Sequence, residues 1–172
     1  MPIPEQRIVV LVADDDENDR LLIEEVFKEA GIQCCIRFVR GGLELMDYLH
    51  NRPPFEDKKC VTPNLILLDL NMPYMDGLEA LEKIRAGAPT KVIPVIILST
   101  APDELTTFQA YALGANAVFL KPPAFEELKD AINAFRLFFT AVPDGLGNSR
   151  QSTPLFPPSF YAAATKIIGS PP

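Results

Sequence analysis

The sequence is poor in the residues that build common hydrolytic and zinc sites. Its one histidine, His50, stands in a polar stretch after a helix pattern, which indicates a surface position. A Ser-His-Asp triad or a zinc site with several histidines is therefore excluded unless His50 alone serves. The cysteines Cys34, Cys35 and Cys60 are odd in number and lack a Cys-x-x-Cys spacing, so we expect reduced thiols, as in a cytosolic protein.

Long hydrophobic runs and an excess of positive charge are also missing. No run approaches the roughly 18 apolar residues of a membrane span. The apolar stretch from Ile8 to Ala13 is too short for a signal peptide, and acids follow it directly. The net charge of −7 opposes general binding to nucleic acid or to anionic membranes. We therefore expect a cytoplasmic protein with no nucleic-acid partner and no membrane partner.

The sequence does contain an alternation of strand and helix patterns. Its hydrophobic share of 48% is enough for a core. Short apolar runs, each followed by a helical pattern, predict strands over residues 7–13, 33–39, 65–69, 92–98 and 117–120. Such alternation is typical of an α/β fold with a parallel, doubly wound sheet, right-handed crossovers and helices on both faces.

The helices are predicted from apolar spacing, caps and stop signals. Asp16 or Asn18 is expected to cap the first helix, and Asp76 the third. The residues expected to face the core are, in chain order, Leu22, Val26 and Ala30; Leu43, Met46 and Leu49; Leu78, Leu81 and Ile84; Leu105, Phe108 and Ala112; and Leu128, Ile132, Phe135 and Phe139. Residues 51–64 form a loop long enough to be functional.

The composition divides the chain at about residue 140. Residues 1–139 carry the strand–helix pairs, whereas residues 140–172 are rich in proline and glycine. We expect this tail, which is too short for an output domain with its own core, to be disordered or laid over a neighbour. Leu137 and Phe138 lie off the core stripe of the fifth helix, so we expect the docked tail or a second copy of the chain, as in a homodimer, to cover them.

Polar side chains stand at the carboxyl ends of the predicted strands. They are Asp14 and Asp15 after the first strand, Asp69 in the third, Ser99 after the fourth and Lys121 after the fifth. In a parallel sheet these ends lie at one edge, where ligands bind. Carboxylates gathered in one pocket repel one another, and a hard divalent ion such as Mg²⁺ relieves that repulsion. With a lysine to bind phosphate oxygens, the set fits phosphoryl transfer to a nucleophilic carboxylate.

Each of these residues also has an ordinary structural explanation. An aspartate after a strand is often a helix cap, and this is the favoured role of Asp16. A lone serine in such a place is by default a cap, and a lone lysine is a solvated charge. The residues at all these strand ends together are more specific than any one of them.

The sequence around these residues resembles the receiver domain of two-component response regulators, over about residues 7–139. The segments that carry the resemblance are Val12-Ala13-Asp14-Asp15-Asp16, Leu67-Leu68-Asp69-Leu70-Asn71-Met72-Pro73-Tyr74-Met75-Asp76-Gly77, Pro94-Val95-Ile96-Ile97-Leu98-Ser99-Thr100, and Gly114-Ala115-Asn116-Ala117 with Lys121-Pro122. The resemblance implies a flavodoxin-like sheet with strand order 2-1-3-4-5.

The resemblance also implies a role for each site residue. Asp69 accepts a phosphoryl group from a phosphohistidine on a sensor histidine kinase. Ser99 moves toward that group, and Lys121, joined to Pro122 by a cis bond, binds one of its oxygens. The implied ligands of Mg²⁺ are the carboxylates of Asp15 and Asp69, the backbone carbonyl of Asn71 and, mostly through water, Asp14.

Two further features bear on the type of regulator. The long loop over residues 51–64 resembles that of single-domain regulators, some of which partner phytochrome-type sensor kinases. Val118 stands three residues before Lys121, where the family usually carries an aromatic that takes part in the switch. Phe119 is expected on the opposite face of the strand, so the signal is expected to leave by another route.

Two other functions stay open beside a non-enzymatic response regulator that signals through protein contacts. One is a Mg²⁺-dependent phosphatase or phosphotransferase with an aspartyl nucleophile. Haloacid-dehalogenase-like enzymes place a second aspartate two residues after that nucleophile, where this sequence has Asn71. The other is an adaptor whose acidic site is never phosphorylated.

Overall fold

The computed structural model describes residues 8–29, 34–56 and 62–121. The predictions made for the fifth helix over residues 125–139, for the tail over residues 140–172 and for the Lys121–Pro122 bond lie outside the described residues. Strand and helix alternate throughout the described part. Its elements are β1 (Ile8–Ala13), α1 (Glu17–Glu29), β2 (Cys34–Val39), α2 (Gly42–Leu49), β3 (Leu65–Asp69), α3 (Gly77–Ala86), β4 (Val95–Ser99), α4 (Glu104–Ala112) and β5 (Ala117–Leu120).

The strands form one parallel sheet with β3 at its centre. The sheet has 5 strands in the order β2-β1-β3-β4-β5, and every neighbouring pair is parallel. This confirms the predicted α/β class and the strand order 2-1-3-4-5 of the flavodoxin-like fold. All residues of β3 are buried, as expected for the central strand of a sheet that is covered on both faces.

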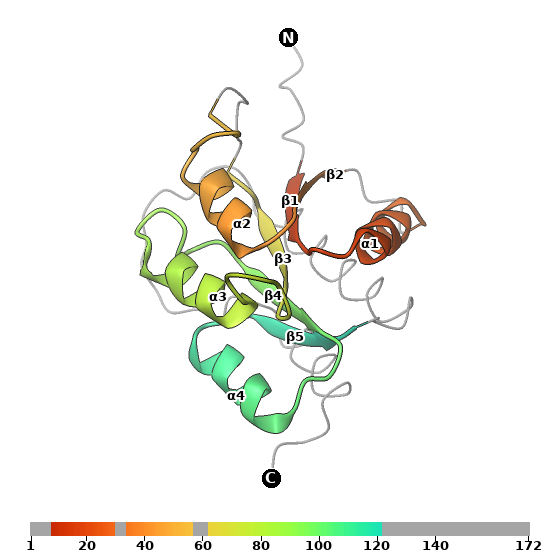
Figure 1. Ribbon diagram of the computed structural model, residues 1–172, viewed down its shortest axis with the longest axis vertical. Coiled ribbons are helices and arrows are strands. Elements are labelled where there is room, and N and C mark those ends of the chain that lie inside the picture. Colours follow the sequence, from red (N-terminus) through yellow and green to blue (C-terminus); the bar gives the residue numbers. More distant parts are fainter. Residues whose placement is uncertain (1–7, 30–33, 57–61, 122–172) are drawn as a thin grey trace, which may run out of the picture.

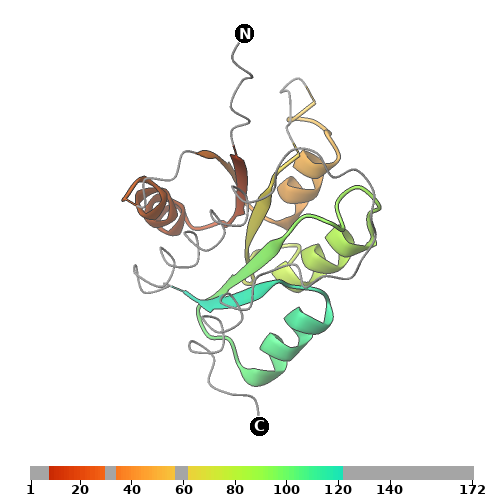
Figure 2. The same cartoon turned by 180° about the vertical axis from the view of Figure 1, so that it is seen from behind.

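The helices lie on both sides of the sheet, as predicted. Figures 1 and 2 show α1 on one face and α2, α3 and α4 on the other. Successive residues of a strand point to opposite faces, so each strand contributes to two cores. In β3, Ile66 and Leu68 pack in the core with α2, α3 and α4, whereas Leu65 and Leu67 pack in the core with α1.

Aspartate side chains cap α1, α3 and α4 at the edge where the strands end. Asp16 Oδ1 accepts a hydrogen bond from the Asn18 backbone N at 2.7 Å, so Asp16 rather than Asn18 caps α1. Asp76 Oδ1 accepts one from Glu79 N at 2.8 Å, which confirms the predicted cap of α3. Asp103 caps α4 in the same way. Each cap satisfies a backbone N–H that has no partner within its helix.

The predicted inward faces of two helices are partly wrong. The exposed residues are Leu43 in α2 and Leu105, Phe108 and Ala112 in α4. Ala110 is the buried residue of α4, and Leu45 lies in the core where Leu43 was expected. Both helices carry apolar side chains on more than one face, so spacing alone does not select the face that packs on the sheet.

The remaining described elements differ from prediction only in detail. In α1, Val26 is buried as predicted together with Ile23 and Phe27, while Leu22 is half-buried. Strand β4 begins at Val95 and not at residue 92. Residues 92–94 lie outside the strand. Pro94 has no N–H to give to a neighbouring strand, although its carbonyl accepts a hydrogen bond from Ile66 N at 2.9 Å.

Candidate functional site

The structure gathers the predicted polar residues at the carboxyl edge of the sheet. Asp14 follows β1, Asp69 and Ser99 end β3 and β4, and Lys121 follows β5. All of these are buried, whereas Asp15 is exposed. Buried polar groups are costly unless they are paired, so the contacts among them define what the site does.

The ammonium group of Lys121 lies among three carboxylates. Its Nζ is 2.5 Å from Asp14 Oδ2, 2.7 Å from Asp19 Oδ2 and 3.3 Å from Asp69 Oδ2. Asp19 was not among the predicted site residues. It lies in the first turn of α1, where acids are common because they suit the positive end of the helix dipole, so its type and position gave no signal of a further role.

Burial and pairing shift the pKa values of these groups in opposite directions. Burial raises the pKa of Asp14 and of Asp69, and the neighbouring Lys121 partly offsets this. Burial also lowers the pKa of Lys121, but its hydrogen bonds to Asp14 and Asp19, together with the negative charges of Asp14 and Asp69, outweigh that effect and raise the pKa above its usual value. Lys121 therefore stays charged and supplies the counter charge of the site.

Backbone N–H groups fix the orientation of the two buried carboxylates. Asp16 N donates to Asp14 Oδ1 at 2.9 Å, and Asn71 N donates to Asp69 Oδ1 at 3.2 Å. The second oxygen of each carboxylate is the one that faces the lysine. In addition, the Arg20 guanidinium donates to the Asp14 carbonyl at 2.7 Å and holds the turn after β1 in place.

A glycine lets α3 begin directly against the end of β3. A Cβ at Gly77 would collide with the carbonyl oxygen of Asp69 and would lie 2.8 Å from Leu70 Cα. With no side chain there, Gly77 N donates to the Leu70 carbonyl at 2.9 Å. The Asp76-Gly77 pair therefore caps α3 and also leaves room for the backbone that carries Asp69.

The loops that follow β3, β4 and β5 are connected to one another. Lys121 N donates to the Ser99 carbonyl at 2.5 Å, which joins the ends of β4 and β5. The side-chain amide of Asn71 donates to Thr100 Oγ1 at 3.4 Å, which joins the loops after β3 and β4. A change at Asp69 therefore has contacts through which to reach the end of β4 and the loop that follows Ser99.

Three of the predicted metal ligands lie close enough to share one ion. Asp14, Asp15 and Asp69 each offer a carboxylate oxygen, and these atoms lie within 4.8 Å of one another. Oxygen atoms of several carboxylates are the donors that hard divalent cations such as Mg²⁺ prefer. The residues present therefore fit the ion, while the role of the Asn71 carbonyl stays a prediction.

The position of the usual switch aromatic is filled by a small core residue. Val118 is buried with α2, α3 and α4 on one side of the sheet, and Phe119 is buried on the other side with α1. The prediction that Phe119 faces away from Val118 is confirmed. No aromatic of β5 therefore lies beside Val118 on its face of the sheet, within the part of the chain described.

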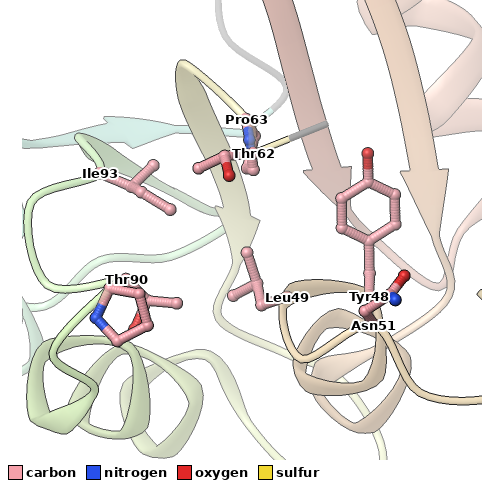
Figure 3. Close-up of a pocket in the computed structure, with 8 residues that line it drawn as sticks. Tyr48, Leu49, Asn51, Thr62, Pro63, Thr90 and Ile93 are labelled. Atoms are coloured by element: carbon pink, nitrogen blue, oxygen red, sulfur yellow. The ribbon is translucent and has the colours of Figure 1, made fainter. Parts of the chain in front are cut away.

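A small cavity lies at the opposite edge of the sheet, away from the carboxylates. Its volume is about 80 Å³, and it is lined by the end of α2, the segment before β3 and the α3–β4 connection. Figure 3 shows Tyr48 and Leu49 on one side and Thr90 and Ile93 on the other. These segments precede β3 and β4 in the chain, so the cavity is not a substrate pocket for Asp69.

The fold and this carboxyl-edge site define a receiver-type signalling domain, and comparison with known proteins agrees. Residues 10–133 match the family model described as the response regulator receiver domain. The match covers most of the chain, and the protein therefore belongs to the response regulator receiver domain family of two-component signalling. None of the helices in the described ranges is long and apolar enough to cross a membrane.

Particular relatives are similar along most of their length. The chain is 33% identical over 131 residues to response regulator Rcp1 of Synechocystis, covering 76% of this chain and 88% of Rcp1. The Mn²⁺-bound structure of Rcp1 is similar with a TM-score of 0.67 and 31% identity, covering 81% and 99%.

Two further solved structures are comparably similar. The phosphorylated cyanobacterial phytochrome response regulator RcpA has a TM-score of 0.68 and 30% identity, covering 78% of this chain and 95% of RcpA. The response regulator RPA3017 in red light signalling of R. palustris has a TM-score of 0.70 and 34% identity, covering 83% and 99%.

Proposed function

We propose that this protein is a response regulator that accepts a phosphoryl group on Asp69 from a phosphohistidine of a sensor histidine kinase and signals through protein contacts. The observation that carries the proposal is the convergence of Asp69, Lys121 and two further carboxylates at one edge of the sheet. In the transfer, a carboxylate oxygen of Asp69 forms a bond to phosphorus as the P–N bond breaks. The electron pair of that bond returns to the imidazole ring.

The residues around Asp69 have distinct parts in this reaction. Mg²⁺, when bound, neutralises charge on the transferred phosphoryl oxygens. Asp14, Asp15 and Asp69 would hold the ion, together with the backbone carbonyl of Asn71. The ammonium of Lys121, 3.3 Å from Asp69 Oδ2, is placed to bind a phosphoryl oxygen.

Ser99 and its loop would carry the signal away from the site. Ser99 is buried at the end of β4, beside Asp69 on β3 in the sheet. Its hydroxyl is a donor that suits a new phosphoryl oxygen. Movement of Ser99 would strain the contact between Thr100 and Asn71 and shift the loop that leads into α4. The exposed surface of α4 then differs between the two states.

The partner kinase is proposed to be of the phytochrome type. The support is the similarity to RcpA, whose structure is that of a phytochrome response regulator, and to RPA3017, which acts in red light signalling. Phosphate transfer from a panel of autophosphorylated kinases tests this, and a phytochrome-type kinase is expected to transfer fastest. A cytoplasmic location, a separate tail over residues 140–172 and a homodimer likewise stay predictions.

One experiment separates this function from its two rivals. The protein is incubated with acetyl phosphate, with and without Mg²⁺, and its intact mass is followed. We expect one phosphoryl group to be gained only with Mg²⁺ and not by Asp69→Asn. Turnover of p-nitrophenyl phosphate would instead favour a phosphatase. Absence of both Mg²⁺ binding and phosphorylation would favour an adaptor.

A further inference from the structure

We propose that Asp19 is a positioning residue that holds the Lys121 ammonium back from Asp69 until Asp69 is phosphorylated. The inference rests on the proposed role of Asp69 as phosphoacceptor. It starts from the distances around Lys121 Nζ, which is 2.7 Å from Asp19 and 3.3 Å from Asp69. The lysine is thus bound more closely by a residue of α1 than by the carboxylate that reacts.

The ammonium group of Lys121 faces three carboxylates. A lysine ammonium has three N–H bonds, and the carboxylates of Asp14, Asp19 and Asp69 surround it. Asp14 follows β1 and Asp19 lies in α1, so both draw the ammonium toward that side of the sheet. A phosphoryl oxygen on Asp69 needs one of these donors, and one carboxylate has to release it.

Asp19 is the partner that can be released at the lowest cost. Its side chain is 30% exposed, whereas that of Asp14 is 0% exposed. Water can therefore solvate the Asp19 carboxylate when the lysine leaves, but it cannot reach Asp14. Asp19 is also absent from the carboxylates that lie close enough to share a metal ion, which are Asp14, Asp15 and Asp69. Its effect is therefore separable from metal binding.

The test is the rate at which acetyl phosphate modifies the full-length protein at saturating Mg²⁺. Asp19→Asn is expected to raise that rate about two- to fivefold, the range for loss of a partly exposed ion pair. Glu17→Gln is the matched control, because Glu17 is an exposed acid in the same turn of α1. It removes the same charge and is expected to change the rate less than twofold.

A second comparison, in a protein that lacks Lys121, tests whether the effect of Asp19→Asn on the rate depends on the lysine. Lys121→Met is expected to react slowly, and adding Asp19→Asn to it is expected to change nothing further. The proposal is overturned if Asp19→Asn slows the reaction, if it matches Glu17→Gln, or if its effect persists without the lysine.

A measurement on the unphosphorylated protein keeps this proposal apart from the role of Asp69. The ammonium protons of Lys121 are followed by ¹⁵N NMR, and we expect Asp19→Asn to speed their exchange with water. If the wild type is never phosphorylated but exchange is faster in Asp19→Asn, the contact holds and the proposed function fails. Unchanged exchange overturns the restraint by Asp19 even where phosphorylation occurs.

Discussion

Lys121 donates a hydrogen bond of 2.5 Å to Asp14 over the ends of two intervening strands. Lys121 follows β5 and Asp14 follows β1, and β3 and β4 lie between those strands in the sheet. The lysine side chain therefore crosses the end of β3, and its ammonium group lies 3.3 Å from Asp69 Oδ2. One lysine at the edge of the sheet thus supplies the positive charge that its buried carboxylates share.

Replacing this lysine should lower the stability of the metal-free protein and strengthen metal binding. Lys121→Met leaves Asp14 and Asp69 buried without their cation, and we expect the free energy of unfolding without Mg²⁺ to fall by about 3 kcal/mol. Mg²⁺ should then bind more tightly and recover much of the loss, because the ammonium no longer repels it. Urea unfolding with and without Mg²⁺ measures both effects. Lys91→Met, at an exposed position, is the control.

The missing side chain of Gly77 should be necessary for the site. Gly77→Ala places a methyl group against the Asp69 carbonyl and Leu70, and we expect a loss of about 1–3 kcal/mol of stability with slower phosphorylation. Glu82→Ala, at an exposed position of the same helix, should change stability by less than about 0.5 kcal/mol. Equal stabilities for the two variants would contradict the packing of α3 on the end of β3.

Removing the N-terminal cap of α3 should cost a moderate amount of stability, of the size usual for helix caps. Asp76→Ala removes the acceptor for Glu79 N, and the free energy of unfolding should fall by about 1 kcal/mol. Asp76→Asn keeps an acceptor oxygen and should retain most of the stability. Denaturant unfolding of the three proteins tests this ranking, and an Asn variant as weak as the Ala variant would refute the hydrogen bond as its cause.

The space around Val118 should not admit the aromatic that the family usually carries there. Val118 is 4% exposed, so Val118→Phe overpacks the core and should cost about 1–3 kcal/mol. Val92→Phe is a matched control, because Val92 is 70% exposed and the same change there should cost far less. Similar Tm values for the two variants would show that β5 has room for an aromatic switch.

The reacting residues could be predicted because each is marked locally. A charge at the end of an apolar run, as at Asp69 and Lys121, is costly to bury unless a partner is near. The parallel arrangement of the strands then places such residues at one edge. No knowledge of packing is needed for this step. The structure brings together the residues that the sequence predicted at the strand ends.

What depends on packing was not predicted. Asp19 reaches Lys121 only because of the way α1 lies over the end of β1, and its sequence position shows only an acid in a first helical turn. Arg85 resembles an ordinary basic residue near the end of α3, yet it donates to the Gly114 carbonyl at 2.9 Å and to Asn116 Oδ1 at 3.0 Å. Long side chains choose partners that are distant in sequence, and spacing does not reveal them.

The chemical identity of the modified residue is the most direct measurement. After treatment with acetyl phosphate and Mg²⁺, borohydride reduces an aspartyl phosphate to homoserine, and peptide mass spectrometry locates it. We predict homoserine at position 69 and at no other aspartate, with none in Asp69→Asn. Homoserine at Asp14 or Asp15, or a phosphoryl label that survives in Asp69→Asn, would contradict the assignment of Asp69 as the phosphoacceptor.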